Sequence, residues 1–194
     1  RGVTGVQTCA LPISSYGDSP YQSFSTFAGN PYFIDPEDLV ARGYVTAEQC
    51  NAYDFGTDIH SVDYGKIYKS RFRLLKEAFE NSHIEEDADF RDFVQKKAYW
   101  LDDYALFMAC KKLHHGADWL HWPDEYRCPS LEFKAGLLKS MHEDIEYYRF
   151  IQFLFFDEWK RIKKYANDHD IRIIGDIPIF VSMDSADVWA NQHL

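Results

Sequence analysis

Asp176 lies inside the most apolar segment of the sequence, IRIIGDIPIFV, which covers residues 171–181. A carboxylate in an apolar layer needs a partner, because desolvation raises its pKa and destabilises the folded chain. Asp176 therefore has two interpretations. It is either a structural carboxylate bound to backbone or to an arginine, or a functional group at the carboxyl end of a barrel strand, where the active sites of such barrels lie. The spacing alone does not choose between them.

Tyr21 is a second candidate, in the segment YGDSPYQSFSTFAGN of residues 16–30. Gly, Ser, Pro and Asn alternate there with aromatic residues, which predicts a loop held by turns and side-chain hydrogen bonds. A loop this long in a compact domain is usually functional or disordered, and the rings of Phe24 and Phe27 favour an ordered one. Tyr21 either packs on Pro20 or offers its ring to the face of a sugar, with the hydroxyl as a polar handle.

Metal and nucleotide chemistry find little support. Cys110 and His114 lie four residues apart, and His121 and Cys128 follow, so a zinc site is conceivable. However, the second pair lacks tight spacing, and the apolar neighbours of Cys110 favour a core position. The sequence has no glycine-rich phosphate loop, zinc-protease motif, nucleophile elbow or calcium loop. We therefore expect no metal and no other cofactor.

Charge and composition exclude several classes of protein. The 194 residues carry 21 Lys+Arg against 31 Asp+Glu, a net charge of −10, and 46% are hydrophobic. That hydrophobic fraction argues against a disordered chain, and no apolar run approaches the ~20 residues that span a bilayer. Nucleic acid is disfavoured because phosphate groups require clustered Lys and Arg. We expect neither nucleic acid nor a membrane as a partner. Aromatic residues reach 17%, which predicts a dense aromatic core or rings that stack on a ligand.

Four cysteines are widely separated, with no CxxC pair: Cys9, Cys50, Cys110 and Cys128. The N-terminus lacks the basic and apolar regions of a signal peptide. Both features favour free thiols and a cytoplasmic location.

We expect most of the chain to be helical. Asp35 followed by Pro36 predicts the start of a short helix that ends at Gly43. Apolar residues at helical spacing predict three longer helices, over residues 66–81, 87–113 and 130–162. The last of these would approach ~50 Å at ~1.5 Å per residue, so we expect a break in it near Gly136.

Residues 171–181 are nearly all β-branched or aromatic, which is typical of a parallel strand buried on both faces. A helix start follows at Asp184, Ser185 and Asp187. Helix, buried strand, loop and helix form the unit of an α/β fold. One strand cannot make a sheet, so we expect both edges of this strand to lack partners and the chain to be cut short.

Two long segments carry a resemblance to a known family. SYGDSPYQSFSTFAGNPYFIDPEDL (residues 15–39) and IRIIGDIPIFVSMDSADVWA (residues 171–190) resemble, in this order, segments of bacterial 4-α-glucanotransferases. These enzymes are also called amylomaltases or disproportionating enzymes and form glycoside hydrolase family 77. WLDDYALFMA (100–109) and QFLFFDEW (152–159) are similar as well. Residues 1–14 do not resemble the family, and we interpret them as an artefactual start.

The resemblance implies a fold for the chain. We expect an incomplete (β/α)8 TIM-barrel fragment, of α/β class, dominated by helices of an inserted subdomain. Residues 15–45 would form a barrel loop with the SPYQ motif, and residues 46–129 the helical insertion. Residues 130–194 would supply the long helix, the barrel strand 171–181 and the start of the next helix.

The resemblance also implies an activity. Family members transfer a segment of an α-1,4-glucan donor to the 4-hydroxyl of glucose or a maltooligosaccharide, by a retaining double displacement that uses two carboxyl groups ~5–5.5 Å apart. Tyr21 matches the tyrosine that stacks on the glucose beside the scissile bond, and Asp176 the aspartate that contacts the same sugar. Tyr16 matches a more remote glucan contact. Nothing matches the nucleophile motif, so we expect the catalytic carboxylates beyond Leu194 and no transferase activity in this chain alone.

A different class of function remains open. The chain could be a non-catalytic carbohydrate-binding or helical interaction module that retains the sugar contacts of the family. Another hydrolase of the α-amylase clan is disfavoured, because SPYQSFSTFAGNPY is typical of the transferases.

Overall fold

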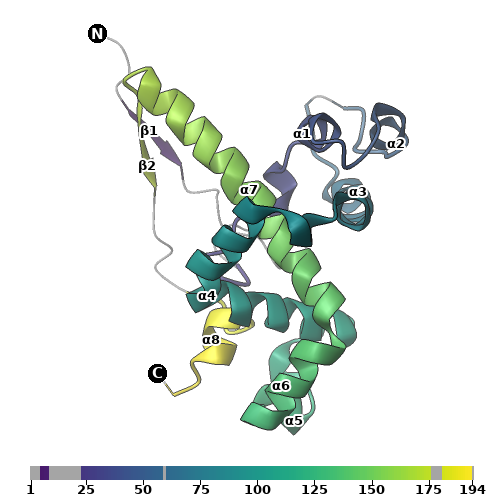
Figure 1. Ribbon diagram of the computed structural model, residues 1–194, viewed down its shortest axis with the longest axis vertical. Coiled ribbons are helices and arrows are strands. Elements are labelled where there is room, and N and C mark those ends of the chain that lie inside the picture. Colours follow the sequence, from purple (N-terminus) through teal and green to yellow (C-terminus); the bar gives the residue numbers. More distant parts are fainter. Residues whose placement is uncertain (1–4, 9–22, 59, 176–180, 194) are drawn as a thin grey trace.

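The computed structural model describes residues 5–8, 23–58, 60–175 and 181–193, and this part of the chain is mostly helical (Figure 1). Three long helices, α3 (Tyr64–Ser82), α4 (Ala88–Leu113) and α7 (His142–Asp168), form its body. The shorter elements are α1 (Pro36–Ala41), α2 (Ala47–Asn51), α5 (Asp124–Arg127), α6 (Leu131–Ser140), α8 (Ala186–Ala190) and the 3-10 helices η1 (Pro31–Phe33), η2 (Ile84–Glu86) and η3 (Trp119–His121).

Polar side chains cap the helix starts. Asp35 accepts a hydrogen bond from the Glu37 amide at 2.9 Å and precedes Pro36, which confirms the predicted start of α1. Asp63 and Asp87 cap α3 and α4 in the same way. Each cap satisfies an amide that has no partner within the helix.

The long apolar period after Ser130 is broken at Met141, not near Gly136 as the sequence predicted. Gly136 lies within α6, whereas Met141 has a non-helical backbone (φ −111°, ψ 19°) between α6 and α7. Leu137 of α6 and Ile145 of α7 are both buried in one hydrophobic cluster. The break therefore lets two successive helices cover the same core.

A two-stranded parallel sheet lies beside α7 (Figure 1). β1 (Gly5–Thr8) pairs with β2 (Arg172–Gly175), so that Gly5 lies opposite Arg172 and Thr8 opposite Gly175. The expectation that both edges of the strand lack partners was therefore wrong, because β1 pairs with one edge.

The described part of the expected strand 171–181 ends at Gly175 and is not buried on both faces. Arg172, Ile174 and Gly175 are exposed, and Ile173 is half-buried. Apolar composition predicts burial only where other elements cover the strand. β2 contacts α7, but the helix does not cover both faces of the strand, and the 60% exposure of Ile174 follows.

Most aromatic side chains pack into two hydrophobic clusters. The first joins α4 with α6, α8 and the start of α7, and contains the fully buried rings of Tyr104 and Phe107. The second joins α3, α7 and the α1 region, and contains Leu74 and Phe150. α4 and α7 contribute to both clusters and pack against each other. Of the two alternatives that composition left open, a dense aromatic core is present in the described residues.

Among the described helices, none is both long and apolar enough to cross a bilayer. Cys50, Cys110 and Cys128 are free thiols, and Cys9 lies outside the described residues.

Candidate functional site

The three residues predicted to bind sugar, Tyr16, Tyr21 and Asp176, lie outside the described residues. Their neighbours in the sequence are described on both sides. Thr8 and Ser23 flank the segment that holds the two tyrosines, and Gly175 directly precedes Asp176. These flanking residues show where the two segments begin and end.

The carboxyl ends of β1 and β2 lie side by side, because the parallel register pairs Thr8 with Gly175. The chain continues from Thr8 into the segment of Tyr16 and Tyr21, and from Gly175 into Asp176. Ligands of parallel sheets bind outside the carboxyl ends of the strands. Both candidate segments therefore follow the ends of strands where a binding site is expected.

The two segments meet again further along the chain, at Asp187 in the first turn of α8. One carboxylate oxygen, Oδ2, accepts hydrogen bonds from the Thr26 amide at 2.7 Å and the Thr26 hydroxyl at 3.0 Å. The other oxygen, Oδ1, accepts from the Ser25 hydroxyl at 3.3 Å. The Ala186 amide donates to the Phe24 carbonyl at 2.8 Å. Residues 24–26 are thus bound to the start of α8.

A buried ion pair supports this junction. Lys111 Nζ, on α4, lies 2.5 Å from Asp184 Oδ2, and both side chains are 6% exposed. The other oxygen of Asp184 accepts from the Trp119 amide at 3.3 Å. The Lys111 ammonium also lies 4.9 Å from the centre of the Phe24 ring, in a cation–π contact. The pair therefore links α4, the segment after β2 and the loop around Phe24.

The same loop also packs on α7, through Gly29. The Gly29 amide donates to Gln152 Oε1 at 2.8 Å, and Gln152 Nε2 donates to the Gly29 carbonyl at 3.0 Å. A Cβ at position 29 would lie 2.0 Å from the nearest carbon of the Phe155 ring, so this close approach requires glycine.

The loop ends on a buried carboxylate of α7. Both oxygens of Glu158 accept from the Asp35 amide, at 3.0 and 3.3 Å. Burial raises the pKa of Glu158 to about 7, against the lowering effect of the Asp35 hydrogen bond. Asp38 adds a smaller charge effect that also raises this pKa. Glu158 anchors the loop at the end far from Asp187.

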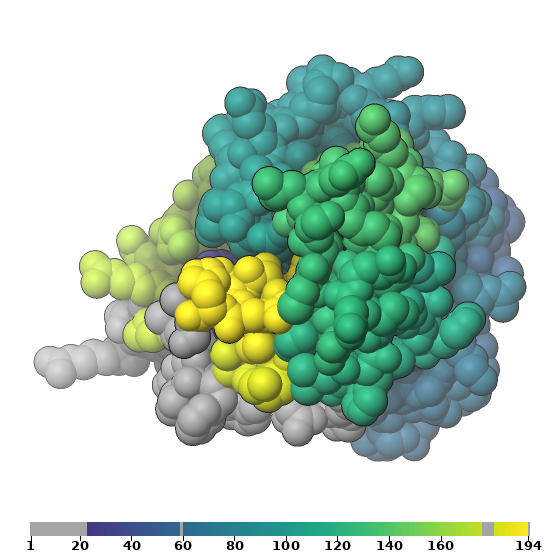
Figure 2. Space-filling view, turned by 90° about the horizontal axis from the view of Figure 1, so that it is seen from below, coloured from purple at the N-terminus to yellow at the C-terminus, as the bar shows by residue number. Residues whose placement is uncertain are grey.

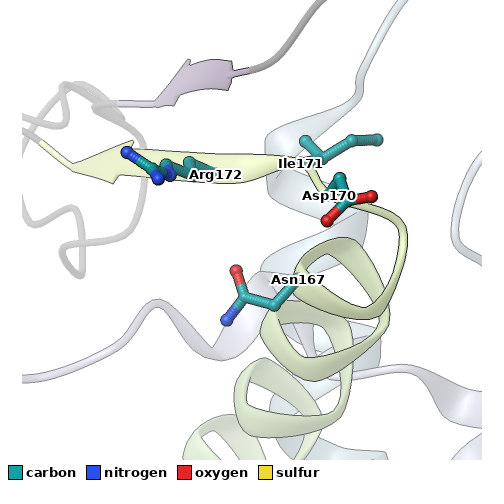
Figure 3. A pocket seen from close by; sticks show the side chains of 4 residues that line it. All are labelled: Asn167, Asp170, Ile171 and Arg172. Atoms are coloured by element: carbon teal, nitrogen blue, oxygen red, sulfur yellow. The ribbon is translucent and has the colours of Figure 1, made fainter.

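A hollow of about 570 Å³ lies elsewhere, lined by Asn167, Asp170, Ile171 and Arg172 (Figure 3). Asn167 belongs to the end of α7, and Arg172 begins β2. The hollow therefore lies at the amino end of β2, whereas Gly175 is at the carboxyl end. The hollow is therefore not at the carboxyl ends of the strands, which the two candidate segments follow.

The zinc interpretation of Cys110 and His114 finds no geometric support. Cys110 is fully buried in the first hydrophobic cluster, and burial raises the pKa of its thiol to about 12. The His114 ring stacks on Trp122 and meets Tyr126 edge-on. Across the described ranges, no three His, Cys, Asp or Glu side chains are grouped so as to hold a metal ion.

Comparison with known proteins identifies the family. The sequence profile described as 4-alpha-glucanotransferase matches residues 2–194. The chain belongs to this family. The match begins at residue 2, earlier than the start at Ser15 that the motifs indicated.

Several 4-alpha-glucanotransferases are similar to the chain. The protein of Streptococcus pneumoniae is 43% identical over 193 residues, which cover 97% of this chain and 38% of that protein. The protein of Thermus thermophilus is 45% identical over 189 residues, covering 95% and 37%. The chain therefore spans less than half the length of these relatives.

Solved structures agree with the sequence matches. The amylomaltase from Streptococcus agalactiae in complex with acarbose superposes with a TM-score of 0.91 at 37% identity, over 98% of this chain and 39% of that one. The amylomaltase from Corynebacterium glutamicum, at 20% identity and a TM-score of 0.75, shares the fold; it matches 100% of this chain and 27% of its own.

The sequence pattern of this family member does not reveal the contacts that join its motif segments. The predicted helix start is confirmed, because Ser185 caps α8 by accepting from the Val188 amide at 3.3 Å and Asp187 lies in the first turn. The side chain of Asp187 also binds the loop, which the sequence pattern does not indicate. Gly29 and Gln152 were not singled out. Both lie in segments that resemble the family, AGN and QFLFFDEW, which was the available signal.

Proposed function

We propose that this chain is the sugar-binding part of an enzyme that transfers a segment of an α-1,4-glucan to the 4-hydroxyl of glucose or a maltooligosaccharide. One observation carries the proposal. The two motif segments follow the paired carboxyl ends of β1 and β2, at Thr8 and Gly175. They are also bound to each other through Asp187. The amylomaltase solved with acarbose supports an α-glucan as the ligand.

The proposal assigns roles to the three predicted residues. Tyr21 stacks on the glucose beside the scissile bond, Asp176 contacts the same sugar, and Tyr16 makes a more remote glucan contact. A ring that lies flat on a sugar offers apolar area, and a carboxylate accepts hydrogen bonds from sugar hydroxyls. The pairing of β1 with β2 supports an incomplete (β/α)8 barrel, whose strands would face the glucan with their carboxyl ends.

The chemistry is a retaining double displacement. One carboxylate attacks the anomeric carbon, and a carboxylic acid protonates the leaving oxygen and then deprotonates the acceptor hydroxyl. Transfer prevails over hydrolysis when the bound acceptor excludes water at the second step. We propose that the 194 residues do not supply this carboxylate pair and do not catalyse transfer alone. The separated free thiols support a cytoplasmic location for the enzyme.

Calorimetric titration of the purified chain tests the binding role. We expect acarbose and maltoheptaose to bind, and cellohexaose, with its β-1,4 linkages, to be rejected. Tyr21→Ala and Asp176→Ala should each weaken binding by about tenfold or more, because each removes one direct sugar contact. Circular dichroism of every variant checks that it is folded. A folded chain that ignores α-glucans, or binds both linkages equally, would refute the proposal.

A chimera tests the transferase role. In it, this chain replaces the matching segment of the Streptococcus pneumoniae relative. We expect the chimera to convert maltotriose to glucose and longer maltodextrins, and the chain alone to produce neither. A folded chimera without activity, together with a chain that binds glucans, would favour a non-catalytic carbohydrate-binding module. Products from the chain alone would overturn the assignment of the carboxylates to another segment.

A further inference from the structure

We infer that Asp187 is a positioning residue for glucan binding, because it fixes the loop after Tyr21 against the segment after Asp176. The inference rests on the proposed function. Asp187 contacts the loop at described residues, whereas Tyr21 and Asp176 lie outside the described residues. It acts through Ser25 and Thr26, which follow Tyr21 by four and five residues.

Three donors of the loop converge on one carboxylate. The Thr26 amide and hydroxyl share Oδ2, and the Ser25 hydroxyl reaches Oδ1. Ser25 is fully buried and its oxygen also accepts from the Phe27 amide at 3.1 Å. Hydrogen bonds to an ionised acceptor are stronger than neutral ones, so this contact determines the path of residues 25–27.

The helix that carries Asp187 is itself firmly held. Trp189 Nε1 donates to the Tyr126 carbonyl at 2.9 Å, and the Trp189 ring is buried in the first hydrophobic cluster. The buried Lys111–Asp184 pair fixes the residues just before α8. Figure 2 shows the C-terminal segment, in yellow, seated against the green residues of α5 and α6. Asp187 is thus a fixed point to which the loop is attached, rather than a mobile side chain that follows it.

Glu158 provides a matched comparison at the other end of the loop. It too is a carboxylate on a helix that accepts a backbone amide of this loop, at Asp35. However, Asp35 lies fourteen residues after Tyr21, and Glu158 belongs to α7 rather than to the segment after β2. Removing Glu158 should loosen the loop only near Asp35, whereas Asp187 is the one of these two carboxylates that joins the segments carrying the predicted sugar contacts.

Three variants of the chain separate positioning from simple stability. Asp187→Ala removes all three acceptor contacts, Asp187→Asn keeps an oxygen for the Thr26 amide, and Glu158→Ala is the control. Acarbose affinity is measured by calorimetry at a temperature where each variant is folded. We expect Asp187→Ala to weaken acarbose binding about tenfold, consistent with losing charge-assisted hydrogen bonds. Asp187→Asn should retain affinity within about threefold, and Glu158→Ala should lower Tm without changing affinity.

Hydrogen exchange of the Thr26 amide reports on the same contact without sugar. Asp187→Ala should speed this exchange, and Glu158→Ala should leave it unchanged. Unaltered acarbose affinity in folded Asp187→Ala would overturn the inference while the proposed function stands. Equal losses of affinity in Asp187→Ala and Glu158→Ala would also overturn it, since the effect would then be general loosening. An unsubstituted chain that is folded and binds no acarbose would refute the proposed function and this inference together.

Discussion

Gln152, in the middle of α7, binds both polar groups of Gly29. Its side-chain oxygen accepts the Gly29 amide proton at 2.8 Å, and its side-chain nitrogen donates to the Gly29 carbonyl at 3.0 Å. Both residues are buried, and Gln152 is 0% exposed. The pairing lets a loop backbone lie against the helix without leaving a buried amide or carbonyl unsatisfied.

Gly29→Ala should destabilise the chain strongly. The new Cβ would lie 2.0–2.4 Å from carbons of the Phe155 ring, so the loop or the ring must move. We expect a loss of about 3 kcal/mol in the free energy of unfolding, measured by urea titration. Gly136→Ala is the control, because nothing lies within 4 Å of its Cβ, and it should raise stability by ~0.5–1 kcal/mol. Equal stability of the two variants would contradict the close approach at Gly29.

Gln152→Leu should leave the Gly29 amide and carbonyl buried without partners. Each such group costs ~1–3 kcal/mol, so we expect a loss of roughly 2–4 kcal/mol, read from the same urea titration. Gln95→Leu, at an exposed position of α4, should change stability by less than ~0.5 kcal/mol. A Gln152→Leu variant as stable as the Gln95→Leu control would show that the two hydrogen bonds contribute nothing.

Lys111→Met should strand the carboxylate of Asp184 in the protein interior. The pair is 6% exposed on each side, and removing one partner of a buried pair costs ~3–5 kcal/mol. Lys96→Met removes a comparable contact with Asp92 at side chains that are 71% and 54% exposed, where the expected loss is below ~1 kcal/mol. Thermal unfolding at neutral pH compares the two. Adding Asp184→Asn to Lys111→Met should recover part of the loss, and failure to do so would argue against a stranded charge.

Glu158 should make the stability of the chain fall as pH rises. Burial raises the pKa of this carboxyl from 4.5 to about 7, so the folded chain binds the proton more tightly than the unfolded chain does. Its contribution is greatest below pH ~4.5, decreases between pH ~4.5 and ~7, and is absent above that range. The free energy of unfolding should therefore be about 3 kcal/mol lower above this pH range than below it.

Glu158→Gln tests this dependence, since glutamine mimics the protonated acid and can still accept from the Asp35 amide. Urea titrations at several pH values should give a variant that is more stable than the unsubstituted chain at pH ~8 and similar to it at pH ~4.5. Glu158 also has charge interactions with four other residues, which are unchanged in the variant: Arg71, Arg161, Asp35 and Asp38. Parallel stability curves across the whole range would refute a raised pKa at Glu158.

Local signals in the sequence were enough to predict α1, α3 and α4. Asp35 and Pro36 predicted the start of α1, and apolar spacing predicted α3 and α4 to within a few residues of Tyr64–Ser82 and Ala88–Leu113. These signals work because capping and helical periodicity involve residues only three or four positions apart. The family was identified from two segments for the same reason, since each motif is continuous in the chain.

Tertiary structure alone decided the partners that are distant in sequence. The pairing of Gly5–Thr8 with β2, the break at Met141, and the attachment of Thr26 to Asp187 have no counterpart in local pattern. Strand pairing depends on which backbone edge is left uncovered once the helices have packed, and a short carboxylate has the same sequence signature whether it caps a helix or binds a loop. The residues that hold the two motif segments together are therefore evident only in the folded structure.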